Sequence, residues 1–115
     1  MKQTDTYTYT ILGNPRPKKR NLKPIIEYAK SAAIQLAQQE KPPIPINTKI
    51  NLKCIFYRSD KRKTDLTNLL NSICDILILS DVILDDNYNI IIGMNGSRVC
   101  YDKENPRVEI TITAA

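Results

Sequence analysis

Residues 65–77 combine apolar and polar side chains with the period of an α-helix. On a helical wheel of about 100° per residue, four polar residues fall within roughly 80° on one side: Asp65, Asn68, Ser72 and Asp75. The other side is apolar and consists of Leu66, Leu69, Leu70, Ile73, Ile76 and Leu77. Such a helix must bury its apolar side against another layer, and we expect its polar side to project carboxylate, amide and hydroxyl groups.

Strand-like segments lie on both sides of this helix. Alternation of apolar and polar residues, or enrichment in Thr, Tyr and Ile, predicts strands at 6–12, 48–58, 98–101 and 107–113, with shorter β-prone stretches at 80–84 and 88–94. A turn is predicted at Asn95-Gly96. A second helix is predicted over residues 23–40, before the prolines that follow break it. This order predicts an α+β fold, in which two main helices pack on a mixed sheet.

The chain has no histidine among its 115 residues. Zinc sites built on histidine, Ser-His-Asp triads and Cys-His pairs are therefore excluded. Its three glycines form neither a P-loop nor a dinucleotide-binding motif. Hydrolytic chemistry would then have to rely on carboxylates that hold a hard divalent cation such as Mg²⁺.

The cysteines and the N-terminus indicate where the chain resides. Cys54, Cys74 and Cys100 are odd in number and widely spaced, so we expect buried, reduced thiols and no disulfide framework. Residues 1–5 lack the apolar core of a signal peptide, and no apolar run reaches the roughly 20 residues of a membrane helix. We therefore expect a single domain over residues 1–115 and a cytoplasmic location.

Charge is distributed unevenly along the chain. Residues 1–63 hold 14 Lys and Arg against 4 Asp and Glu, and residues 64–115 hold 3 against 8, which gives net charges of +10 and −5. The basic half predicts a polyanionic partner, and a cation would have to sit in the acidic half. The basic residues expected to contact DNA phosphates are Arg16, Lys18, Lys19, Arg20, Lys61, Arg62 and Lys63, with Lys23 and Arg58 beside them in the same two clusters. The alternative is a solvated surface that only keeps the chain in solution.

Oxygen-bearing side chains that suit a cation occur at Asp65, Asn68 and Asp75 on the helix, and at Asp85 and Asp86 after it. Structural roles are the alternative at each position. An Asp that opens a helix can cap it, a polar helix face can simply be solvated, and an Asp-Asp-Asn sequence favours a turn. These roles can coincide, since a capping carboxylate can bind a cation with its second oxygen.

The sequence also resembles a known family. The basic loop before residue 64, TDLTNLL at 64–70, Asp75, LDD at 84–86 and PRVEITI at 106–112 resemble the RusA family of phage-type Holliday junction resolvases. Members of that family are small homodimeric endonucleases that use Mg²⁺ to nick four-way DNA junctions in symmetric pairs. The resemblance implies a RusA-like homodimer that acts on branched DNA in recombination and repair, in a bacterial cell or a phage-infected host, with Mg²⁺ or Mn²⁺ as its metal.

The resemblance also implies roles for individual residues. Asp65 stands where the family's D-x-D-N motif opens with a metal-binding Asp, and Asn68 matches its Asn. Asp86, preceded by Asp85, matches the downstream acidic pair, and Asp75 matches a recurrent Asp of the helix. The implied metal ligands are Asp65 and Asp86, with Asp85 and Asp75 completing the site.

Two positions depart from the family pattern. Thr67 replaces the second Asp of D-x-D-N, and Asn71 replaces a Lys that assists catalysis. Loss of the Asp leaves less negative charge for a cation. The competing hypothesis is therefore a catalytically weak protein that binds branched DNA or has a regulatory role while keeping the fold. A third interpretation is a small basic protein with an ordinary acidic surface and no such role.

Overall fold

The computed structural model describes residues 5–17 and 23–115, which form two helices and five strands. In chain order the elements are β1 (Thr6–Leu12), α1 (Lys23–Ala37), β2 (Ile50–Arg58), α2 (Leu66–Leu79), β3 (Ile91–Gly93), β4 (Arg98–Tyr101) and β5 (Arg107–Ala114). Within these residues, neither helix is long and apolar enough to cross a membrane.

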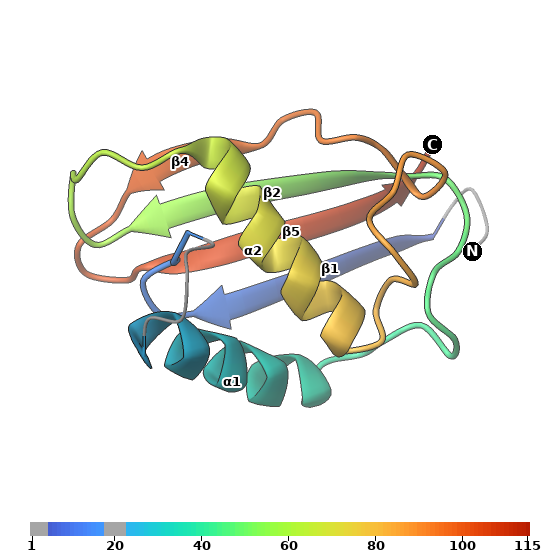
Figure 1. Cartoon of the computed structure of the whole chain (residues 1–115), viewed down its shortest axis with the longest axis horizontal. Helices are drawn as coiled ribbons and strands as arrows, with labels where there is room; N and C mark the ends of the chain where they lie inside the picture. The colour runs from blue at the N-terminus through green and yellow to red at the C-terminus, as the bar shows by residue number, and fades with distance from the viewer. Residues whose placement is uncertain (1–4, 18–22) are drawn as a thin grey trace.

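The strands form one mixed sheet (Figure 1). β5 lies between β1 and β2 and is antiparallel to both. On its other side, β2 pairs in parallel with β3 near its start and with β4 near its end. The predicted α+β class, with two helices and a mixed sheet, is confirmed.

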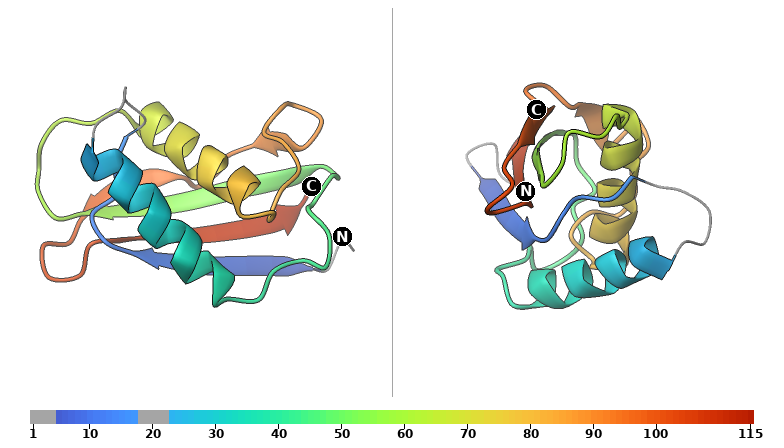
Figure 2. Two further views of the ribbon diagram at one scale, coloured as in Figure 1. Left: turned by 60° about the horizontal axis from the view of Figure 1, so that its bottom comes forward. Right: turned by 90° about the vertical axis from the view of Figure 1, so that its left-hand side faces the viewer.

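Both helices cover the same face of the sheet (Figure 2). Alternation along the strands directs apolar side chains toward them. The buried residues of this face are Tyr9 and Ile11 from β1, Ile50, Leu52, Cys54 and Phe56 from β2, and Val108, Ile110 and Ile112 from β5. From α2, Leu69, Ile73 and Leu77 close the core, as their helical spacing predicts.

The predicted turn at Asn95–Gly96 separates β3 from β4 along one edge of the sheet. Ser97 bridges the gap between these two strands. Its hydroxyl accepts a hydrogen bond from the Cys54 backbone N–H at 3.0 Å and donates one to the Leu52 carbonyl at 3.3 Å. The backbone of β2 therefore keeps its hydrogen bonds where the partner strand is interrupted.

The free edge of β1 is covered by two glutamines of the α1 region. Gln39 bonds both the N–H and the carbonyl of Thr10, at 3.2 and 2.9 Å. Gln35 does the same for Leu12, at 2.7 and 3.0 Å. These side chains occupy backbone groups that another strand could otherwise pair with.

Several boundaries differ from the prediction. α1 ends at Ala37 and not at residue 40, because the N–H groups of Gln38 and Gln39 bond three residues back and tighten the last turn. β2 begins at Ile50 and not at residue 48. The predicted stretch 80–84 makes only one bridge, from Ile83 to Ile46, and the stretch 88–94 contributes only β3.

The three cysteines are free thiols. Cys54 and Cys74 are buried as predicted, and burial raises the pKa of the Cys54 thiol. Cys100 lies on β4 and is half-buried, so the prediction of burial is wrong for this residue.

Candidate phosphate and metal site

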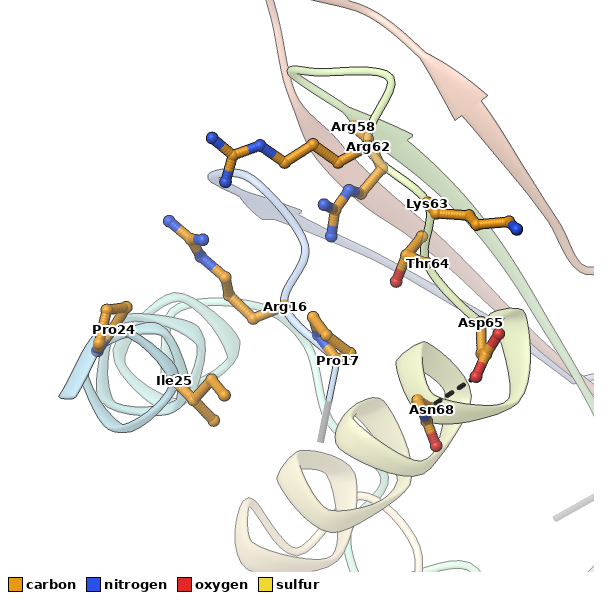
Figure 3. Close-up of a pocket in the computed structure, with 10 residues that line it drawn as sticks. All are labelled: Arg16, Pro17, Pro24, Ile25, Arg58, Arg62, Lys63, Thr64, Asp65 and Asn68. Atoms are coloured by element: carbon orange, nitrogen blue, oxygen red, sulfur yellow. Dashed lines mark hydrogen bonds between the residues drawn. The ribbon is translucent and has the colours of Figure 1, made fainter. Parts of the chain in front are cut away.

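A pocket of about 440 Å³ opens between three parts of the chain: the residues after β1 with the first turn of α1, the end of β2 with its connection to α2, and the first turn of α2 (Figure 3). The residues that line it are Arg16, Pro17, Pro24, Ile25, Arg58, Arg62, Lys63, Thr64, Asp65 and Asn68. Four cationic side chains therefore share one pocket with a carboxylate and an amide. We call it the α2 pocket.

Arg58 is a buried basic residue of the α2 pocket lining. It continues the inward-facing side of β2 after Phe56 and is only 7% exposed. Its Nη1 donates to the Pro15 carbonyl at 2.8 Å, and its Nη2 lies 3.5 Å from Asp60 Oδ1. Its Nε has no hydrogen-bond partner among residues 5–17 and 23–115. A buried guanidinium is costly unless its donors are satisfied, so this free donor calls for an acceptor.

The loop between β2 and α2 is fixed by short-range bonds. Asp60 Oδ1 accepts the Arg62 backbone N–H at 2.9 Å, and the Ser59 N–H donates to Asn14 Oδ1 at 2.9 Å. The bond from Arg62, and then the nearby Arg58 guanidinium, lower the pKa of the Asp60 carboxyl. The second bond joins the two connections that line the pocket.

Asp65 occupies the N-cap position of α2, in extended conformation, but its side chain makes no capping hydrogen bond. The capping role considered from the sequence is therefore not realised by its carboxylate. Asn68 Nδ2 lies 3.4 Å from Asp65 Oδ2, one turn along the helix. Both residues line the α2 pocket, so the structure brings together these two predicted site residues (Figure 3).

Other predicted residues on α2 lie elsewhere. Asp75 follows Asp65 by ten residues, which is about 15 Å along the helix axis, and does not line the pocket. Thr67 is exposed and also lies outside the lining. Ser72, expected on the polar side, is buried. The helical wheel predicted that Ser72 is exposed, but the rest of the fold covers α2 over a wider arc than its apolar side.

Asp85 and Asp86 lie far from Asp65 within one chain. Asp85 accepts the Asp86 backbone N–H at 2.7 Å and the Asn87 side chain at 3.1 Å. The turn considered from the sequence lies just after this pair, at residues 88–90, where the Ile90 N–H donates to the Asn87 carbonyl at 3.0 Å. The surrounding segment runs beside the start of β2, through the pairing of Ile83 with Ile46 and the bond from the Ile50 N–H to the Ile90 carbonyl.

Asp65, by contrast, follows the end of β2, a strand about 26 Å long. Figure 1 shows the two segments at opposite ends of α2. In the described part of the chain, no three Asp, Glu, Cys or His side chains gather closely enough to hold a metal ion. The predicted ligand set of Asp65, Asp85 and Asp86 is therefore not assembled within a single chain.

The residues predicted to contact DNA fall into three groups. Arg16, Arg62 and Lys63 line the α2 pocket. Lys61 lies outside it, with its Nζ 5.0 Å above the centre of the Tyr101 ring. Lys18, Lys19 and Arg20 lie outside the described residues.

The sequence analysis did not predict that Arg58 and Thr64 line the same pocket as Asp65. The Thr64 hydroxyl is buried in the pocket lining, with no hydrogen-bond partner in the part of the chain that the structure describes. The sequence does contain a signal for Arg58, because alternation along β2 places it on the buried side. It contains none for Thr64.

Comparison with known families gives one match. The family model described as Endodeoxyribonuclease RusA matches residues 11–113. The match covers both helices, most of the sheet and every residue that lines the α2 pocket. No curated protein matches the chain.

Proposed function

Because the chain belongs to the RusA family of endodeoxyribonucleases, we propose that it cuts branched DNA, with the four-way junction as its substrate. We further propose that it acts in recombination and repair, in the cytoplasm of a bacterial cell or a phage-infected host.

The α2 pocket is the observation that carries this proposal. Arg16, Arg62 and Lys63 line the same pocket as the Asp65 carboxylate. Cationic side chains hold DNA by its phosphates, and they carry no sequence preference by themselves. A carboxylate in such a pocket repels phosphate, and a cation bound between the two groups would remove that repulsion. Its presence there favours phosphodiester hydrolysis over simple DNA binding.

The donors around Asp65 suit Mg²⁺, and we propose that Mg²⁺, or Mn²⁺ in its place, binds there. Mg²⁺ takes one or two protein carboxylates and completes its shell with water and phosphate oxygens. Asp65 supplies one carboxylate, and the Asn68 amide donates to it and orients it. The bound ion would supply an activated water and neutralise charge on the phosphate. Asp65 would hold that ion, and the arginines would hold the DNA.

A homodimer would complete this acidic set, and we propose that Asp86 of the partner subunit joins Asp65. Asp85 and Asp86 are exposed, and they lie among exposed apolar side chains, which are Leu79, Leu84, Tyr88 and Ile92. Exposed apolar groups concentrated on one segment are typical of an interface. The acidic segment also complements the basic α2 pocket. Two-fold symmetry would then form two such sites, matching a junction cut twice.

The proposal is tested with a synthetic four-way junction and a linear duplex of the same sequence, each incubated with Mg²⁺, Mn²⁺ or EDTA. Nicking of the junction in either metal, and none in EDTA, is the expected result. Binding of the junction with no cleavage in either metal would favour the catalytically weak DNA-binding protein. Equal cleavage of both DNAs would contradict the junction as substrate.

A further inference from the structure

Arg58 lines the α2 pocket, and one of its hydrogen-bond donors, Nε, is not used. Its other groups are engaged, since Nη1 donates to Pro15 and Nη2 faces Asp60, while Nε has no partner in residues 5–17 and 23–115. The side chain is more than nine-tenths buried and lines the pocket. Water does not reach this Nε, so an acceptor brought to it from the pocket would gain a charge-assisted hydrogen bond.

Other hydrogen-bond donors share the pocket. The Thr64 hydroxyl is buried and has no partner within the described segments. The first turn of α2 leaves N–H groups without helical partners, and the Asp65 side chain does not cap them. Arg16 also lines the pocket, with a side chain that points away from Asp65 (Figure 3). Donors outnumber acceptors here, which indicates an anion.

From these groups we infer that Arg58 and Thr64 form a specific phosphate-binding site, which holds one DNA phosphodiester next to Asp65. The pocket's volume of about 440 Å³ lies within the range of about 300–1,000 Å³ typical of small-ligand sites, so a phosphodiester group can enter. The inference deepens the proposed function and rests on it for the identity of the anion. The binding of phosphate itself does not depend on cleavage.

The α2 pocket contains two kinds of basic residue. Arg62 and Lys63 are exposed, so their contacts are screened by salt and provide general affinity. Arg58 is held by Pro15 and Asp60, so it fixes where the phosphate lies. Arg58 is therefore a positioning residue, whose loss should reduce cleavage of bound DNA more than binding itself.

The first test follows the N–H signal of Arg58 Nε by NMR while inorganic phosphate replaces chloride at constant ionic strength, without metal or DNA. Arg107 is the internal control, because its Nε already donates to Glu109 at 3.0 Å. A saturable shift of the Arg58 signal, with the Arg107 signal unmoved, is expected. No shift of the Arg58 signal, or an equal shift of both signals, would overturn the inference.

Thr64 variants supply a second test that does not depend on a substitution of buried Arg58. Thr64→Val removes the hydroxyl at constant shape, and Thr64→Ser is the matched control that keeps it. Because this hydroxyl makes no hydrogen bond in the described structure, Thr64→Val should leave the thermal midpoint unchanged or raised. The same change should raise the dissociation constant for phosphate about 3- to 10-fold.

Phosphate affinity that is unaltered by Thr64→Val would contradict the site. The two proposals also fail separately. Junction cleavage by a protein whose Arg58 signal ignores phosphate would overturn only the inference about the pocket. Phosphate binding at Arg58 by a protein that cuts no DNA would overturn only the proposed function.

Discussion

Asp65 opens α2 without capping it, so its carboxylate does not contribute the hydrogen bond that an N-cap side chain usually makes. Asp65→Asn should therefore change the free energy of unfolding by less than about 0.5 kcal/mol, since Asn caps as well as Asp. The variant should lose Mg²⁺-dependent cleavage, because an amide cannot replace the negative charge. It should also bind the junction more tightly in EDTA, since one phosphate-repelling charge is gone.

The matched control is Asp81→Asn, which makes the same change of charge after the other end of α2. It should alter neither cleavage nor metal-free affinity. Measurements of junction affinity in EDTA, cleavage in Mg²⁺ and thermal stability decide the matter. Full activity of Asp65→Asn would show that the cation binds elsewhere.

Asp60 makes the loop of the α2 pocket sensitive to acid. Its pKa is lowered by the bond from the Arg62 N–H and by Arg58, so the ionised form is favoured in the folded protein. A carboxyl with a lowered folded pKa contributes stability above its unfolded pKa and loses it as pH falls through the folded value. The thermal midpoint of wild type should therefore exceed that of Asp60→Asn at pH 6. The difference should shrink as the pH falls below about 4, the unfolded pKa, and vanish below the lower folded pKa. A difference that persisted at low pH would contradict this role.

At the scale of elements, Gln35 and Gln39 protect the edge of β1 with four hydrogen bonds to its backbone. Their joint replacement by Ala should lower the free energy of unfolding by about 1–3 kcal/mol. It should also promote self-association, because an uncovered edge can pair with another chain. Gln38→Ala is the matched control on the same turn. Thermal unfolding and light scattering measure both effects, and a double variant that matched the control in both would refute the explanation.

Periodicity predicted most elements, and it did so because each half-buried strand and helix repeats its own pattern of burial. β1 and β4 have the predicted bounds. Which strands pair with each other could not be predicted from this periodicity. That β3 and β4 both lie along β2, with Ser97 filling the gap, depends on contacts between residues more than forty positions apart.

The candidate site was predictable only in part, for the same reason. Asp65 and Asn68 are one helical turn apart, so the sequence alone placed them together. Asp86 is separated from Asp65 by the length of α2, and motif order carries no information about that distance. Arg58 owes its role to burial beneath two loops, which only the tertiary structure contains.

At the scale of the whole molecule, the proposed dimer predicts complementation between inactive variants. Asp65→Asn and Asp86→Asn should each be inactive alone. In a mixed dimer, the intact Asp65 of one subunit would meet the intact Asp86 of the other, and one site of two would be restored. Mixing the variants should therefore recover nicking of single strands. If the subunits are shown to exchange and no activity returns, the shared site is contradicted. Either both carboxylates then belong to a site within one chain, or Asp86 lies outside the site.

Paired cleavage of a four-way junction is the property that unites the α2 pocket, the metal and the dimer. A supercoiled plasmid that extrudes a cruciform measures it directly, because two nicks made in one encounter linearise the plasmid and a single nick only relaxes it. With Mg²⁺ the protein should yield linear DNA cut at the cruciform, whereas Asp65→Asn or EDTA should leave the plasmid supercoiled. Relaxed circles as the sole product would contradict paired cleavage, and a plasmid bound but uncut would contradict the assignment as a nuclease.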